Sequence, residues 1–211
     1  MVALIVAGGK KPGKELLYRF VEKADIIIGA DSGGKSLKHD DIETFALVGD
    51  FDSLDKNSLK WFKRNNTQIL ISNEDKDETD TMLAVDLAVD EGAKKIYILG
   101  ALGQRMDHQY ANIALLMYAK RKGAKAFLTD EKNCAFIADK NEEIQASTGD
   151  FFSVFSVSKK AKFISSDGLK YPLDGLVLRR DTPIGVSNEA TESVVKIAVK
   201  KGEVLIIKSL E

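Results

Sequence analysis

Residues 2–29, VALIVAGGKKPGKELLYRFVEKADIIIG, contain the pattern that decides the fold. The apolar run Val2–Ala7 is typical of a buried strand, and Lys14–Ala24 has the spacing of an amphipathic helix. The β-branched run Ile26–Gly29 indicates a second strand. A strand, a helix and another strand in this order predict two parallel strands joined by a crossover helix.

The same alternation continues to about residue 128. Further strand candidates are Phe45–Val48, Ile69–Ile71, Ile96–Leu99 and Ala126–Leu128, and further helix candidates are Leu54–Arg64, Thr79–Glu91 and Asp107–Lys122. We therefore expect an α/β domain over residues 1–128, with a mainly parallel sheet flanked by helices on both faces.

From about residue 129 the pattern changes to short apolar runs separated by turns. These strand candidates are Phe151–Val157, Ala161–Ile164, Val194–Val199 and Val204–Ile207. No helix-length amphipathic pattern lies between them. We expect residues 129–211 to form a small antiparallel β-domain, like a sandwich or a barrel, that is marginal alone and is stabilised by packing on a neighbour.

The composition excludes several classes of function. Lysine and arginine number 31 against 32 acidic residues, a net charge of −1, so no overall positive field attracts nucleic acid or an anionic membrane. The apolar runs are far shorter than the roughly 20 residues that cross a bilayer. One cysteine and two histidines provide no internal disulfide and little for zinc. We expect a cytoplasmic protein with neither nucleic acid nor membrane as its partner.

Acidic residues follow the predicted strands. Asp31 follows the second strand, Asp50 and Asp52 follow the third, and the acid-rich stretch 75–80 precedes a helix that begins near Asp80. The carboxyl ends of parallel strands meet at one sheet edge, where α/β proteins bind ligands. Asp50 and Asp52, separated by one residue in an extended segment, point to the same side, so they can share Mg²⁺, which ordinarily accompanies phosphates. Alternatively, residues 75–78 form a solvated loop and Asp80 only favours its helix N-terminus.

Two glycine-rich stretches resemble phosphate-binding loops. Gly29–Ser36 satisfies the P-loop pattern of glycine, four residues, glycine, lysine and serine. However, only about eight residues separate it from the strand at Phe45, too few for the usual long helix. Asp31 would also place an anion inside an anion-binding loop. Gly8–Lys14 is a weaker match, followed by Glu15 where a hydroxyl is required, and its alternative is a plain glycine-rich turn.

A third glycine-rich stretch, Gly100–His108, follows the fifth strand. Its glycines allow close approach of the backbone to a ligand, and Arg105 can bind phosphate through its planar guanidinium. His108 and Asn112 share a helix face, although a lone histidine at a helix start is more often structural than catalytic.

These segments, in this order, resemble the thiamine pyrophosphokinase (thiamine diphosphokinase) family over nearly the whole chain. The resembling stretches are Gly29–Gly34, Gly49–Ser53, Asp75–Asp80, Gly100–His108, Gly168–Leu173 and Gly185–Glu189. The resemblance implies transfer of diphosphate from MgATP to the hydroxyethyl oxygen of thiamine, giving thiamine diphosphate and AMP. It also implies a nucleotide-binding catalytic domain, a thiamine-binding β-domain, and a homodimer with active sites between subunits.

The resemblance also assigns roles to residues. It implies a metal site of Asp31, Asp50, Asp52 and Asp80, a nucleotide site of Asp31, Gly33, Gly34, Thr79, Gly100, Gly103 and Arg105, catalytic roles for Asp80 and Asp107, and thiamine contacts from Ser187 and Asn188. Ser32 departs from the glycine of many members, and Lys35 from a small residue. The tryptophan that eukaryotic-like members place beyond the serine–asparagine pair is absent, because the only tryptophan is Trp61.

The chemistry expected is in-line attack of the thiamine hydroxyl on the β-phosphorus, with Asp80 or Asp107 as candidates to take the proton. One alternative is a P-loop NTPase that uses Lys35 and Ser36 and releases ADP and phosphate. Another is a sensor that binds nucleotide or thiamine without turnover.

Overall fold

The computed structural model describes residues 1–52, 54–72, 77–103 and 105–210. The chain divides into two compact units, Met1–Glu131 and Lys132–Glu211. Among the positions of the predicted motifs, Ser53, Asp75, Lys76 and Gln104 lie outside the described residues.

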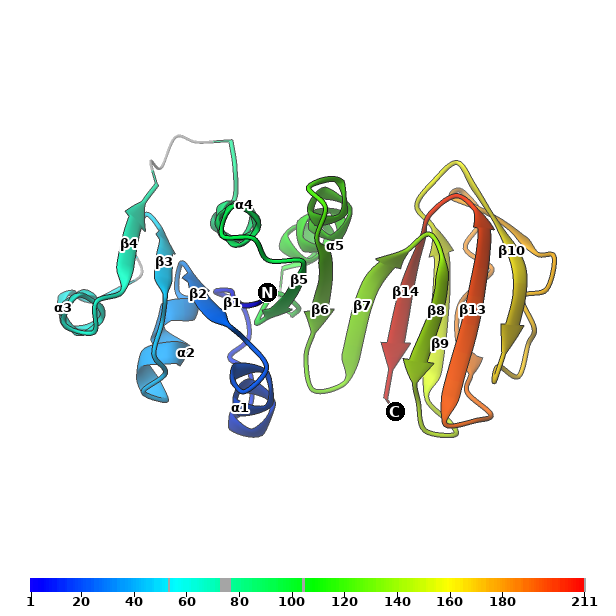
Figure 1. Ribbon diagram of the computed structural model, residues 1–211, viewed down its shortest axis with the longest axis horizontal. Helices are drawn as coiled ribbons and strands as arrows, with labels where there is room; N and C mark the ends of the chain where they lie inside the picture. Colours follow the sequence, from blue (N-terminus) through cyan, green and yellow to red (C-terminus); the bar gives the residue numbers. More distant parts are fainter. Residues whose placement is uncertain (53, 73–76, 104, 211) are drawn as a thin grey trace. The chain divides into compact units, whose positions relative to one another are not determined.

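The first unit alternates strands and helices (Figure 1). Its strands are β1 (Val2–Val6), β2 (Ile26–Ala30), β3 (Ala46–Gly49), β4 (Gln68–Ile71), β5 (Lys95–Leu99) and β6 (Lys125–Thr129). Its helices are α1 (Lys14–Val21), α2 (Gly33–His39), α3 (Lys56–Arg64), α4 (Asp80–Asp90) and α5 (Met106–Arg121). The strands lie in the order β6-β5-β1-β2-β3-β4, and neighbouring strands pair in parallel.

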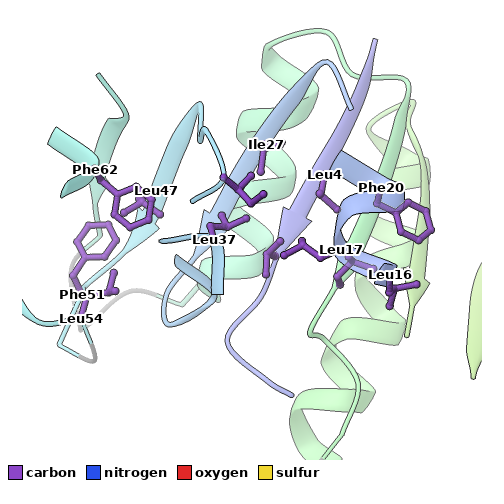
Figure 2. Close-up of a cluster of buried hydrophobic side chains, with 13 residues drawn as sticks. Leu4, Leu16, Leu17, Phe20, Ile27, Leu37, Leu47, Phe51, Leu54 and Phe62 are labelled. Atoms are coloured by element: carbon purple, nitrogen blue, oxygen red, sulfur yellow. The ribbon is translucent and has the colours of Figure 1, made fainter. Parts of the chain in front are cut away.

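Helices cover both faces of this sheet. Figure 1 shows α1 and α2 on one face and α4 and α5 on the other. On the face of α1 and α2, Leu4 and Val6 of β1 belong to a buried cluster that includes Leu17, Leu37 and Phe62 from the helices (Figure 2). The intervening Ala3 and Ile5 are also fully buried, as expected when both faces of a parallel sheet are covered.

The second unit is made of antiparallel strands. They are β7 (Asn133–Ala138), β8 (Asn141–Gln145), β9 (Phe151–Ser156), β10 (Lys160–Asp167), β11 (Val177–Arg179), β12 (Asn188–Glu189), β13 (Val194–Lys201) and β14 (Val204–Ser209). Within the unit they run in the orders β12-β9-β14-β7 and β11-β10-β13-β8. Burial alternates along β9 and β13, so each strand has one face in the unit's interior.

The predicted fold class is confirmed at the level of a parallel α/β sheet followed by antiparallel strands. The structure adds a short helix, α2, and strands β7, β8, β11 and β12, which the sequence patterns did not indicate. Residues 132–210, all of which are described, contain no helix. No helix in the described part of the chain is both long and apolar enough to span a bilayer.

Candidate active site

Three carboxylates converge where β2 and β3 end. One oxygen each from Asp31, Asp50 and Asp52 lies within 4.8 Å of the other two. Asp31 follows β2, and the other two follow β3, which pairs in parallel with β2. The predicted convergence of these acids at the carboxyl edge of the sheet is therefore observed. Such a set of hard oxygen donors suits Mg²⁺ held directly or through waters.

The loop that carries Asp50 and Asp52 is a turn, so the expected extended segment was wrong. Phe51 between them has a φ of 62°, and the Asp52 N–H donates to Oδ1 of Asp50 at 3.1 Å. The Phe51 ring is buried in the hydrophobic cluster of Figure 2. Burial of this ring fixes the turn, and the turn, in place of strand alternation, brings the flanking carboxylates to one site.

Asp80 is the first residue of α4 and faces the same edge. The Thr79 hydroxyl accepts the Met82 N–H at 3.2 Å and so caps the helix. The Ser72 hydroxyl donates to Oδ1 of Asp80 at 3.1 Å. Asp80 thus begins a helix as expected, and a serine beyond β4 orients its carboxylate.

A cavity of about 460 Å³ lies at the carboxyl ends of the strands of the first unit. Of the predicted site residues, Asp31, Thr79, Asp80, Gly100, Gly103 and Arg105 are among its described lining residues, whereas Asp50, Asp52 and Asp107 are not. The lining also includes Gly8, Gly9, Lys10, Glu78, Gln109 and Asn112, which were not among the predicted site residues. The first three could have been found, because they follow β1 and so must reach the same sheet edge.

The loop after β5 is fixed to α5. The Asn112 side chain donates to the Ala101 carbonyl at 2.8 Å, and the Gln109 side chain donates to the Gly103 carbonyl. Gly100 has a φ of 67°, and a Cβ there would press on the Ala7 carbonyl at 2.6 Å. This glycine is therefore required for the close approach of the β1 and β5 loops.

Arg105 and Asp107 form an ion pair at the start of α5. The Arg105 Nη2 lies 2.5 Å from Oδ2 of Asp107, and the Asp107 carboxylate also accepts the His108 N–H at 3.0 Å. The hydrogen bond from Arg105, followed by that from His108, lowers the pKa of Asp107 to about 2. Asp107 is consequently a weak base, and Arg105 is held close to the cavity that it lines.

The burial around α2 argues against the P-loop hypothesis. The helix begins at Gly33, inside the motif, and Ser36 is buried on it. A Cβ on Gly33 would collide with the Val6 carbonyl, and one on Gly34 would lie 3.0 Å from Cδ2 of Leu47. These two glycines, predicted to bind nucleotide, are not among the described residues that line the cavity. They allow α2 to pack closely on the sheet.

Ser187 and Asn188 lie in the second unit, at the start of β12. The Asn188 side chain is buried and makes two hydrogen bonds to the backbone of Tyr171. Its Oδ1 accepts the Tyr171 N–H at 3.0 Å, and its Nδ2 donates to the Tyr171 carbonyl at 2.6 Å. Ser187 is exposed with a φ of 55°, and its N–H donates to Oγ of Ser153 at 3.2 Å. Asn188 therefore holds the turn at Tyr171, while Ser187 beside it is an exposed residue.

We expect Asn188→Ala to destabilise the protein by about 2 kcal/mol, because it removes the two hydrogen bonds that the buried Asn188 side chain makes to the Tyr171 backbone. Urea unfolding followed by far-UV circular dichroism measures the change. Asn141→Ala, at an exposed asparagine of β8, is the matched control and should be neutral. Equal stability of the two variants would show that the Asn188 bonds contribute nothing.

Comparison with known proteins identifies the family. The model described as "Thiamin pyrophosphokinase, catalytic domain" matches residues 17–128, and that described as "Thiamin pyrophosphokinase, vitamin B1 binding domain" matches residues 129–204. The chain belongs to the thiamin pyrophosphokinase family. The thiamine pyrophosphokinase of Bacillus subtilis (strain 168) is 28% identical over 209 residues, which are 98% of each chain.

Solved structures of the thiamin pyrophosphokinase family share the fold. A crystal structure of the Bacillus subtilis protein has a TM-score of 0.87 at 26% identity, with both chains covered completely. That of the Geobacillus thermodenitrificans thiamin pyrophosphokinase has a TM-score of 0.85 at 25% identity, covering 100% of this chain and 98% of that one. The family membership expected from the ordered motifs is thus confirmed.

Proposed function

We propose that Asp31, Asp50, Asp52 and Asp80 hold Mg²⁺ and, through it, the phosphates of ATP, because Asp31 belongs both to the carboxylate cluster and to the cavity of the first unit. The activity is that of the family, ATP-dependent transfer of diphosphate to thiamine to give thiamine diphosphate. The observation that carries the metal assignment is the convergence of three carboxylates within 4.8 Å. Like charges this close repel one another unless a cation neutralises them.

The remaining residues of the cavity position the nucleotide. Bound Mg²⁺ would supply charge neutralisation on the transferring phosphates. Arg105 presents a planar guanidinium that can bind phosphate at two points, and Gly100 and Gly103 leave room for the polyphosphate beside the backbone. Thr79 fixes the N-terminus of α4, whose dipole favours an anion. Catalysis rests on positioning and on charge neutralisation, as is usual in phosphoryl transfer.

Asp80 is the better candidate for accepting the proton of the thiamine hydroxyl. Both Asp80 and Asp107 were candidates, but the pKa of about 2 makes Asp107 a weak base. Asp80 lines the cavity and is oriented by Ser72. In this assignment Asp107 acts through Arg105, whose guanidinium it holds.

We expect Asp107→Asn to lower kcat by less than about tenfold, whereas loss of a general base costs a hundredfold or more. The folded-state pKa lies below the usual value for aspartate, so the carboxylate stays charged until the pH falls toward about 2. Asp107 therefore does not titrate between about pH 5 and 9, and the variant should keep the acid limb of the kcat profile. A lost acid limb would restore Asp107 as the base.

The second unit is proposed to bind thiamine. The hydroxyl group of the exposed Ser187 can bond to the aminopyrimidine, and the buried Asn188 holds the adjoining turn. We further propose that residues 1–128 and 129–211 are the two functional domains, that the antiparallel sheets form a sandwich, and that the enzyme is a homodimer with active sites between subunits. A cytoplasmic location remains a prediction.

Product analysis tests the proposed function. The protein is incubated with thiamine and MgATP, and phosphorus NMR distinguishes AMP from ADP. Thiamine diphosphate and AMP in equal amounts are expected. ADP and phosphate would indicate the NTPase alternative, and calorimetric binding of both ligands without any AMP would indicate a sensor. Lys35→Ala should leave AMP formation unchanged, because the exposed Lys35 is neither among the described cavity residues nor a proposed metal ligand.

A further inference from the structure

Lys10 lines the cavity and carries a positive charge, but it has no role in the metal site or the catalytic step proposed above. Among the described lining residues, lysine and arginine are represented by Lys10 and Arg105. Arg105 already bonds to Asp107 at 2.5 Å. The Lys10 ammonium lies 3.7 Å from Oε2 of Glu131, and its side chain is 70% exposed. A long, exposed ion pair contributes little free energy, so the Lys10 ammonium can leave Glu131 and bind a more highly charged anion.

The loop that carries Lys10 is anchored on both sides. On the strand side, the Gly9 N–H donates to the Gly100 carbonyl at 2.8 Å, and the Ser32 hydroxyl donates to the Gly8 carbonyl at 3.1 Å. On the helix side, the Gly13 N–H donates to Oε1 of Glu131 at 2.7 Å. Lys10 therefore projects from a backbone held in place, which reduces the entropy lost when its ammonium binds a ligand.

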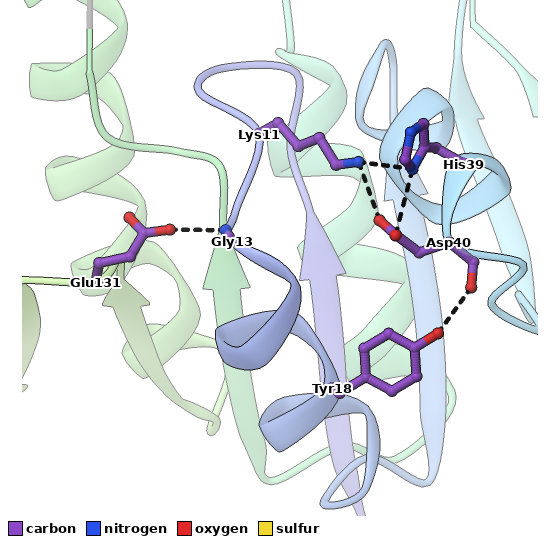
Figure 3. Close-up of polar contacts among 6 residues, drawn as sticks. All are labelled: Lys11, Gly13, Tyr18, His39, Asp40 and Glu131. Atoms are coloured by element: carbon purple, nitrogen blue, oxygen red, sulfur yellow. Dashed lines mark hydrogen bonds and ion pairs between the residues drawn. The ribbon is translucent and has the colours of Figure 1, made fainter.

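The neighbouring lysine is bound elsewhere, as Figure 3 shows. The Lys11 ammonium lies 3.1 Å from Oδ2 of Asp40 and 2.9 Å from Nδ1 of His39. Burial raises the pKa of Asp40, but hydrogen bonds from Lys11 and His39 outweigh it and leave the pKa below its usual value. Lys11 is thus an anchor of the loop on a nearly buried carboxylate, whereas Lys10 faces the cavity.

We propose that Lys10 binds the polyphosphate of ATP, and that Glu131 positions it by holding Gly13. The proposal rests on the proposed function, since it deepens the nucleotide site. The cavity presents Asp31, Glu78 and Asp80 to a ligand that is itself anionic, so cations besides Mg²⁺ are needed near the phosphates. A lysine serves this purpose as a compact point charge that adjusts to the phosphate oxygens.

Lys10→Met tests the proposal, because methionine keeps the aliphatic stem that lies beside Gly103 and removes the charge. We expect KM for ATP to rise about tenfold, with KM for thiamine unchanged. Calorimetry with Mg²⁺ and α,β-methylene-ATP should show the same loss of affinity, because that analogue retains the polyphosphate and cannot release AMP. Lys35→Ala is the matched control.

The outcomes separate the two proposals. Wild-type protein that forms no AMP would refute the proposed function. Active wild-type protein with unchanged ATP KM and analogue affinity in Lys10→Met would overturn the role of Lys10 alone.

The positioning role of Glu131 is tested by a pair of variants. Glu131→Ala should raise KM for ATP several-fold at nearly unchanged kcat, and by less in the Lys10→Met background, because the two residues act together. Glu131→Gln should restore the wild-type KM, since its amide oxygen can still accept the Gly13 N–H. Equal defects in the alanine and glutamine variants would overturn this role.

Discussion

We expect Asp50→Asn to lower kcat for AMP formation by about a hundredfold or more, about 2.7 kcal/mol in the transition state, because the cation site loses one of its charged oxygens. The fold should be unaffected. An asparagine side-chain oxygen can still accept the Asp52 N–H that Asp50 now binds at 3.1 Å, so the turn around Phe51 is retained. The loss of kcat therefore measures the contribution of the negative charge of Asp50.

Steady-state kinetics at increasing Mg²⁺ measure this effect, and the apparent Mg²⁺ requirement should rise in the variant. Asp90→Asn is the matched control, because it removes an exposed carboxylate from the last residue of the same helix that begins with Asp80. It should retain activity within about twofold, as is usual for an exposed surface site. Full activity of Asp50→Asn would exclude Asp50 as a metal ligand.

Gly33→Ala is expected to have the largest effect on stability, a loss of about 3 kcal/mol or more, because the new methyl would collide with the Val6 carbonyl. The backbone of β1 cannot move aside as a side chain can, because β1 is paired with β2 and β5. The melting temperature should fall by about 10 °C. Thermal unfolding followed by circular dichroism measures the change.

Gly34→Ala is the matched control for this experiment. Its methyl would lie 3.0 Å from the end of the Leu47 side chain, which can move. The higher helix propensity of alanine, about 1 kcal/mol, offsets the tight contact, so stability should hardly change. A Gly33→Ala protein that is stable but no longer binds ATP would contradict the packing role and would return this glycine to the nucleotide site.

The sequence predicts the first unit well because its strands are apolar and its helices periodic. Helix α2 was missed because GGKSLKH has no apolar periodicity and begins with two glycines, which are poor helix formers. Strand β8, NEEIQ, was missed because its exposed positions are polar and only Ile144 is a large apolar residue. Both elements are specified by packing or pairing with distant segments, which the local sequence does not reveal.

The candidate site was predictable where it depends on strand ends. Parallel topology predicts that Asp31, Asp50 and Asp52 reach the same edge of the sheet. The turn at Phe51 could not be predicted, because it depends on burial of that ring among residues from other elements. The proposed role of Lys10 could not be predicted for a related reason. Lys10 and Lys11 are adjacent and identical in sequence, and they differ in the structure because Lys11 pairs closely with Asp40 whereas Lys10 pairs only loosely with Glu131.

The central claim is that the carboxylates at the ends of β2 and β3 bind a divalent cation together with nucleotide. Crystals grown with Mn²⁺ and α,β-methylene-ATP test it directly, because Mn²⁺ replaces Mg²⁺ at oxygen ligands and scatters anomalously. The account predicts an anomalous peak among Asp31, Asp50 and Asp52, in contact with a phosphate of the analogue. Bound nucleotide with no peak there, or a peak remote from these carboxylates, would contradict it.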